Sequence, residues 1–201
     1  STDGKFKKTA FEVVSYGKKV AQQLATNVVV VTINATDATE LYAYGAEKVL
    51  AVSNEGLTTF NAKEYAAVLA QAASKENATI VVVDSSINGL YLSPLVAVSL
   101  DAGYASNTVS EPSNINPFTV KRKAFSNKAF SNTIISTNKK VIGLAKNSFG
   151  IHENPVVGTL EAFDVTIAAS GVKSESVERI TGKVTIADAD TVVSAGRGLK
   201  G

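Results

Sequence analysis

Two unbroken runs of β-branched residues constrain the fold more than any other feature. Val28–Ile33 reads V-V-V-V-T-I and Ile80–Asp84 reads I-V-V-V-D, and neither run alternates with polar residues. An unalternating apolar run is typical of a strand covered on both faces, as in a parallel sheet between helices. Ahead of the first run, apolar residues recur at helical spacing over Ala10–Leu24, which leaves Glu12 and its charged neighbours to water.

The first half of the chain continues this alternation of helix and strand. Lys48–Val52 is predicted as a further strand, and Asn61 with Glu64 resembles an N-cap pair that opens a helix. A short helix is expected over 35–46 and a further helix over 88–101, with Pro94 tolerable only near the first turn of the latter. The order β-α-β-α-β-α predicts an α/β fold: a three-layer, Rossmann-like, mostly parallel sheet.

The second half has short strands separated by Asn, Ser, Lys and Gly. We expect antiparallel hairpins that extend the parallel sheet, with one turn at Asn138–Lys140. A polar connection over 171–190 follows, with Val177–Ile186 as one further candidate strand, and the composition shifts at Asp188. We therefore divide the chain into an α/β domain, 1–188, and the start of a second domain, 189–201. The candidate strands of this half are Phe118–Ala124, Thr133–Thr137, Val141–Ala145 and Leu160–Thr166.

The last residues carry glycines at the spacing G-x-G-x-x-G. Gly196, Gly198 and Gly201 follow a β-branched strand-like run, and Arg197 lies between the first two. Glycines directly after a strand let the backbone approach a phosphate, and a following helix would offer its free N–H groups. The spacing alone leaves two interpretations open: a phosphate-binding turn, or a flexible tail.

Composition excludes several classes of function. Lys and Arg total 20 against 18 for Asp and Glu, and the basic residues are scattered, so no nucleic-acid surface is indicated. No apolar run approaches the roughly 18 residues that a membrane span needs, and no signal peptide opens the chain. The absence of cysteine excludes disulfides and thiolate chemistry. We expect a soluble intracellular protein.

The sequence contains few candidate catalytic residues. The single histidine is His152. The sequence has no G-x-S-x-G motif whose serine His152 could activate, and it has no further ligands at metal-binding spacing, so an ordinary loop position is favoured. Asp84, Ser85 and Ser86 follow a predicted parallel strand, where α/β sheets commonly bind ligands; the alternative is that Asp84 caps a turn. The basic run Lys121–Lys123 is most simply a solvated strand edge.

Several stretches together resemble a known family. Ala189–Gly201 reads A-D-T-V-V-S-A-G-R-G-L-K-G and resembles the A-D-x-V-V-S-G-G-R-G-L-K-G segment of the electron transfer flavoprotein α (large) subunit, which opens its FAD-binding domain. The resemblance covers nearly the whole chain in order and spacing. Its other parts are D-G-K-F-K-K at Asp3–Lys8, Y-G-A-E-K-V at Tyr44–Val49, the helix Gly89–Leu100 and the strand pair Lys121–Ala145.

The sequence departs from the family's pattern in three places. Ala195 stands where the family has the first glycine of G-G-R-G. Leu90, Tyr91 and Leu95 replace charged residues, so no polar role is carried onto that helix. The family's opening strand, ahead of D-G-K-F-K-K, and nearly all of its FAD domain are absent, and we expect the chain to be a fragment.

The resemblance implies an electron carrier rather than an enzyme, built on an adenine nucleotide α-hydrolase-like domain. Its FAD would accept electrons from acyl-CoA dehydrogenases of fatty acid β-oxidation and related enzymes, and would pass them to a membrane quinone reductase. The β subunit would complete a heterodimer in the bacterial cytoplasm or the mitochondrial matrix. Ser194, Gly196, Arg197 and Gly198 are the implied cofactor-binding residues, with Arg197 stabilising the anionic reduced flavin.

For the isolated chain, the resemblance implies a scaffold and subunit-assembly surface that does not retain FAD and that self-associates. Without the rest of their domain, residues Ser194–Gly201 are expected to be poorly ordered or held only by another molecule. A different class of function also remains open: a small nucleotide-binding α/β module that uses the loops after Val31 and Asp84.

Overall fold

The computed structural model describes residues 4–168, 170–172, 174–177, 186, 189, 191–196 and 198. The interior of the candidate strand Val177–Ile186 and the domain boundary at Asp188 lie outside these residues.

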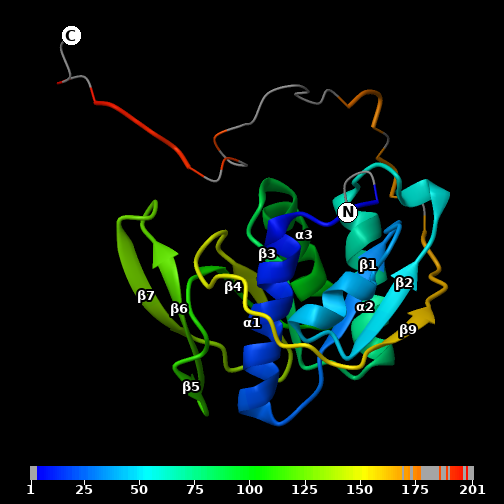
Figure 1. Ribbon diagram of the computed structural model, residues 1–201, viewed down its shortest axis with the longest axis horizontal. Helices are drawn as coiled ribbons and strands as arrows, with labels where there is room; N and C mark the ends of the chain where they lie inside the picture. The colour runs from blue at the N-terminus through cyan, green and yellow to red at the C-terminus, as the bar shows by residue number, and fades with distance from the viewer. Residues whose placement is uncertain are drawn as a thin grey trace.

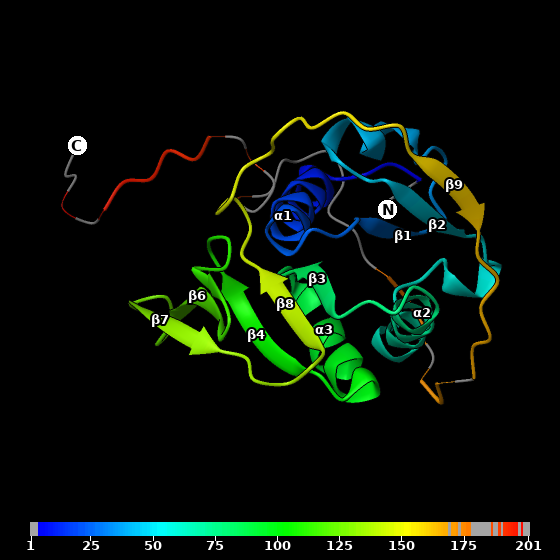
Figure 2. The same cartoon turned by 90° about the horizontal axis from the view of Figure 1, so that it is seen from below.

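The chain forms three layers, with strands between helices (Figures 1 and 2). Helix α1 covers one face of the strands, and α2 with α3 covers the other. The expected α/β class, with a parallel sheet extended by antiparallel strands, is confirmed. In chain order the elements are α1 (Lys8–Leu24), β1 (Val29–Ile33), the 3₁₀ helix η1 (Thr39–Tyr44), β2 (Lys48–Val52), η2 (Glu55–Leu57), α2 (Ala62–Lys75), β3 (Ile80–Asp84), α3 (Ile87–Leu100), β4 (Gly103–Thr108), β5 (Asn114–Ile115), β6 (Phe118–Ala124), β7 (Ala129–Ile134), β8 (Lys140–Leu144) and β9 (Thr159–Ala162).

The strands form two sheets rather than one continuous sheet. β1, β2 and β9 make a parallel sheet, and β3, β8, β4, β6 and β5 make a second sheet to which β7 adds through β6. Figure 2 shows the two sheets side by side, with β1 and β3 at their facing edges. Apolar clusters join each sheet to the helices: Tyr16 and Val20 of α1 pack on Ile142 of β8, and Val96 of α3 packs on Val141.

The expected antiparallel order of the last strands is wrong. β8 lies between β3 and β4 and is parallel to both, and β9 is parallel to β2. Residues Asn138–Lys140 therefore lead into a central strand and form no hairpin turn. The hairpin partner of β6 is β7, and the turn lies at 125–128. The physical reason is burial, since four of the five β8 residues are buried, as in a strand covered on both faces.

Local chemistry explains the smaller differences. The sequence pattern does not predict β4 or β5, because G-Y-A-S-N-T has a single β-branched residue and N-I is only two residues long. Pro94 lies in the middle of α3 rather than near its first turn. The helix tolerates it because Pro94 and Leu90 are both exposed, so water can bond the Leu90 carbonyl that loses its N–H partner.

The basic run Lys121–Lys123 does not form a strand edge. It lies in β6, which pairs with β7 on one side and with β4 and β5 on the other. Arg122 donates from Nε to the carbonyl of Ser106, at 3.0 Å, and from a terminal nitrogen to the Ser106 hydroxyl, at 3.1 Å. Arg122 therefore fastens β6 to β4, which a sequence motif of three basic residues does not reveal.

Two helical glycines have opposite surroundings, which predicts opposite effects of alanine. A Cβ on Gly89 of α3 would lie 1.8 Å from the backbone oxygen of Asp84, whereas a Cβ on Gly17 of α1 would meet only Val28, at 3.9 Å. We expect Gly89→Ala to lower the free energy of unfolding by about 1–3 kcal/mol, because the backbone must shift. Gly17→Ala should raise it by about 0.5–1 kcal/mol, because alanine favours the helix.

Urea unfolding of the two variants measures both effects, with Gly17→Ala as the matched control. A Gly89→Ala variant as stable as the parent chain would show that α3 does not pack closely against the end of β3.

Candidate functional site

The described residues of the terminal glycine motif lie apart from the folded layers. Ser194, Gly196 and Gly198 are exposed, and a Cβ added at either glycine would meet no atom within 4 Å. Arg197 lies outside the described residues. Figure 1 shows the segment 191–196, in red, extending away from the strands and helices. The described residues of the motif form no wall around a cofactor and do not by themselves fit an enclosed flavin.

The polar residues after β3 bond to one another and to the start of α3. The Ser86 hydroxyl accepts the N–H of Gly89 at 3.1 Å and donates to the Asp84 carboxylate at 3.0 Å. The Ser85 hydroxyl accepts the N–H of Asn107 at 3.2 Å. Ser86, rather than Asp84, is thus the capping residue, and this cluster serves local structure.

The loop after β1 is closed in a similar way. The side-chain amide of Asn34 donates to the carbonyl of Asn54 at 2.9 Å, and its oxygen accepts the N–H of Asn54 at 2.9 Å. This reciprocal pair joins the loops after β1 and β2. A nucleotide-binding module would use the loops after β1 and β3. Several polar groups of these two loops already bond to adjacent loops and helix ends.

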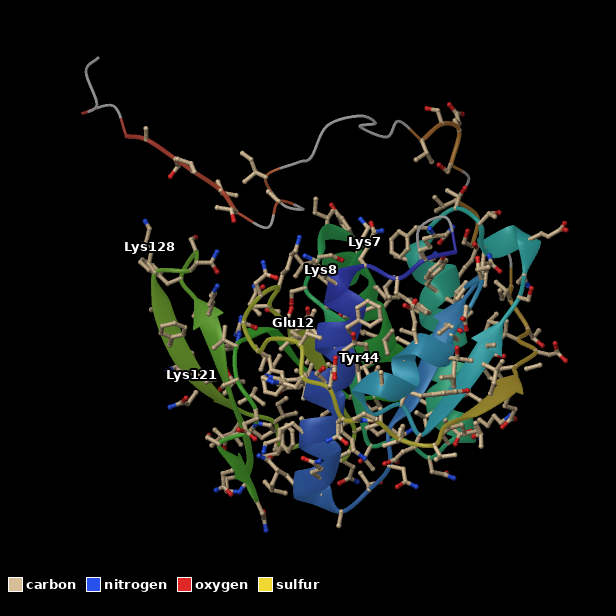
Figure 3. All side chains as sticks on the ribbon, viewed as in Figure 1. Lys7, Lys8, Glu12, Tyr44, Lys121 and Lys128 are labelled. Carbon is tan, nitrogen blue, oxygen red and sulfur yellow. The ribbon has the colours of Figure 1, made fainter. Side chains whose placement is uncertain are left out.

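A buried carboxylate that sequence reasoning assigned to solvent organises the loop after β8. Glu12 of α1 is 3% exposed, because its carboxylate lies in a nest of four backbone N–H groups. Figure 3 labels its side chain on α1. Oε1 accepts from Ser148 and Phe149 at 2.9 Å and from Gly150 at 3.0 Å, and Oε2 accepts from Asn147 at 2.9 Å. The positive φ angles of Asn147 and Gly150 turn these donors inward. Asn and Gly in the segment after a strand were the only sequence signal for this nest.

His152 completes the same loop. The ring is exposed; one ring nitrogen lies 3.1 Å from the carbonyl oxygen of Phe149, and the ring meets Phe149 edge-on, with the centroids 5.2 Å apart. Its backbone exchanges two hydrogen bonds with the Ser15 hydroxyl of α1, at 3.0 and 3.1 Å. These contacts fix the loop against α1, as expected of an ordinary loop histidine.

A cavity of about 750 Å³ lies between the two sheets. β1 and β3 form two of its walls, and residues of α1 and α2 line it as well. Its lining is mixed: apolar side chains such as Val13 of α1 and Leu69 of α2 lie beside polar ones such as Glu76 and Asp84. Within the described part of the chain, no group of three or more acidic or histidine side chains is placed to hold a metal ion. No helix among the residues that the structure places is long and apolar enough to cross a membrane.

Comparison with known proteins identifies the family. The model of the electron transfer flavoprotein domain matches residues 1–181. The chain belongs to the electron transfer flavoprotein family. It is similar to the electron transfer flavoprotein subunit alpha of Bacillus subtilis (strain 168), with 28% identity over 203 residues, which cover 98% of this chain and 62% of the relative.

Two further relatives agree with this assignment. The electron transfer flavoprotein subunit alpha of Clostridium acetobutylicum is 24% identical over 197 residues, which cover 96% of this chain and 55% of the relative. The acryloyl-CoA reductase electron transfer subunit beta of Anaerotignum propionicum is 26% identical over 119 residues, 58% of this chain and 32% of the relative. The chain spans less than two-thirds of the length of these electron transfer flavoprotein relatives.

The family assignment confirms the resemblance to an α-subunit N-terminal domain. Electron transfer flavoproteins are electron carriers rather than enzymes, which agrees with the few candidate catalytic groups in the sequence.

The Glu12 nest gives a prediction for stability and loop order. Glu12→Gln replaces one acceptor oxygen with an NH₂ group that faces backbone donors, so we expect the free energy of unfolding to fall by about 1–3 kcal/mol. Amides 147–150 should also exchange with solvent faster. Urea unfolding and hydrogen exchange measure the two effects, with the exposed Glu153→Gln as the control. Unchanged exchange at these amides would refute the role of Glu12.

Proposed function

We propose that this chain is the scaffold and subunit-interface part of an electron transfer flavoprotein large subunit. The complete protein would carry electrons on FAD from acyl-CoA and related dehydrogenases to a quinone reductase. In that assembly the chain would pair with a β subunit, and Ser194, Gly196, Arg197 and Gly198 would contact the cofactor. The bound FAD supplies the redox chemistry, and the protein holds and tunes it.

The family match over residues 1–181 is the observation that carries this proposal. The structure supports the scaffold part of it in a second way, because polar groups after β1 and β3 and the Glu12 carboxylate are engaged in holding loops and helix ends. Such a domain offers surfaces for assembly rather than a site for chemistry. We place the protein in the cytoplasm of a bacterium, because the relatives it matches come from bacteria.

Helix α3 supplies the surface that we assign to association. Ile87, Tyr91 and Val98 are 77%, 68% and 82% exposed, and their spacing places them on one stripe of the helix. An apolar stripe of this kind on a soluble domain marks an interaction site. It lies on the helix where the sequence has apolar residues in place of the charged ones typical of the family.

The first prediction from this function concerns the cofactor. Chain 1–201, purified after expression, should carry no stoichiometric FAD, because the exposed residues of the terminal motif cannot bury an isoalloxazine. The visible absorption spectrum measures the flavin content. A flavin band at one equivalent would contradict the scaffold role and would place the cofactor within this chain.

The second prediction concerns self-association through α3. Sedimentation of chain 1–201 across a concentration series should show weak association or a dimer. Tyr91→Lys and Val98→Lys should shift the chain toward the monomer without loss of stability, because both side chains are exposed. Ser99→Lys, an exposed change on the same helix, is the matched control.

A chain that stays monomeric to high micromolar concentration would contradict this assignment. The same α3 variants should weaken a one-to-one complex of the full-length α subunit with its β subunit. Equal β-subunit binding by Ser99→Lys and the two stripe variants would place that interface elsewhere.

A further inference from the structure

The hairpin of β6 and β7 lies within the longest stretch of the chain that has no acidic residue. No Asp or Glu occurs between Glu111 and Glu153, and this stretch holds seven of the 20 Lys and Arg residues. Four of the seven, Lys121–Lys123 and Lys128, lie in β6 and in the turn that joins it to β7. All acidic residues lie outside the stretch, so the charge of the chain is divided unevenly and the hairpin is positive.

The register of the two strands separates a buried face of the hairpin from an exposed one. Residues directly opposite each other in an antiparallel pair lie on the same face. Val120 of β6 is buried against Tyr16 of α1, so its face belongs to the core. The opposite face presents basic and apolar side chains together. With Phe125 and Lys128 of the turn we call it the hairpin face, and its strand residues are Thr119, Lys121, Lys123, Phe130, Asn132 and Ile134.

Three apolar side chains of the hairpin face are largely exposed to solvent. Phe125 is 79% exposed, Phe130 62% and Ile134 59%. Each of the two rings has an ammonium group close to it. Lys121 Nζ lies 4.6 Å from the centroid of the Phe130 ring, and Lys128 Nζ lies 6.0 Å from that of Phe125. The hairpin face therefore offers cations and apolar groups at the same place rather than in separate patches.

The exposed groups lie at the outer edge of the molecule. Figure 1 shows β6 and β7 on the side of the fold away from β1 and β2. In Figure 3, Lys128 lies at the end of the hairpin and Lys121 on its outer side. Among the described strands, β7 pairs only with β6. A flat surface can therefore reach the turn and β7 without a hollow to receive them.

A lipid surface with anionic headgroups matches this combination of side chains. Amphipathic elements that lie in a membrane interface place Phe or Leu at the boundary of the acyl chains and Lys or Arg among the headgroups. A lysine stem can extend along an apolar surface while its ammonium group stays in water, and Lys121 lies over Phe130 in this manner. A protein partner needs a surface shaped to fit the two exposed rings, whereas a fluid interface adapts to them.

We propose that the hairpin face is a peripheral binding site for anionic lipid membranes. Phe125 and Phe130 enter the headgroup layer, and Lys121, Lys123 and Lys128 contact the lipid phosphates. The chain lies on the membrane and does not cross it. Binding is weak and reversible, because each lysine near such a surface raises the affinity only about fivefold. The proposal goes beyond the electron-transfer function and does not depend on it.

Co-sedimentation with vesicles measures the binding of chain 1–201. Vesicles of phosphatidylcholine with a quarter of phosphatidylglycerol should bind the chain at least about tenfold more tightly than vesicles of phosphatidylcholine alone. Raising the salt from about 0.1 M to about 1 M should release it, because the Debye length falls from about 10 Å to about 3 Å. Lys128→Gln should weaken binding about fivefold. Lys63→Gln, at an exposed position of α2, is the matched control.

A tryptophan at the turn reports whether the hairpin enters the lipid. The chain contains no tryptophan, so Phe125→Trp supplies a single emission signal. Its emission should shift to the blue with the anionic vesicles, because the ring leaves water. Val157→Trp, at a position that is 99% exposed in the loop before β9, should show no shift. Phe125→Ser should weaken vesicle binding about tenfold, because an apolar ring is no longer buried.

Three results with vesicles would overturn the proposal. They are equal binding to anionic and neutral vesicles, equal loss of binding in Lys63→Gln and Lys128→Gln, and an unshifted emission of Phe125→Trp on anionic vesicles. Addition of the β subunit without lipid is the remaining arm. A blue shift of Phe125→Trp with the β subunit and none with vesicles would identify the hairpin face as a protein interface and would also refute the lipid site.

Discussion

The pairing of parallel strands along both edges is the constraint on which this domain depends. A strand with apolar residues on both faces gains its stability only when helices cover both faces and neighbouring strands satisfy its backbone. β2 and β8 meet this condition, since each has a partner on either side. Among the strands that the structure describes, β1 pairs with β2 and β3 pairs with β8, and a cavity lined by α1 and α2 lies between β1 and β3.

The helices and loops compensate for the division between the sheets by linking elements distant in sequence. Glu12 holds the loop after β8 against α1, although more than 130 residues separate them. On the other side, Lys48 bonds Glu76 and Glu161 at 2.7 and 2.8 Å, which fastens β9 and the end of α2 to β2. Hydrogen bonds from Lys48 and then Lys75 lower the pKa of the Glu161 carboxyl to about 2. These hydrogen bonds and ion pairs hold the helices and strands together across the two sheets.

Polar side chains near the strand ends and apolar side chains on α3 have different surroundings. Near the carboxyl ends of the strands, the side chains of Asn34, Ser86 and Glu12 bond to the protein itself. The exposed apolar stripe of α3, in contrast, has no such local role. The exposed apolar face of α3 is the surface that we propose for assembly in this member of the electron transfer flavoprotein family.

The sequence by itself determined the α/β class, most of the helix and strand positions in the first half, and the family, because these follow from local periodicity and from motifs read in order. It located the N-cap at Asn61, whose side chain accepts from Lys63 and Glu64. Only the tertiary structure decided that β8 inserts between β3 and β4, that Glu12 is buried, and that the sheet is divided at β1 and β3. Each of these outcomes depends on partners far away in the chain, and a local pattern carries no information about which distant backbone or amide group a residue will meet.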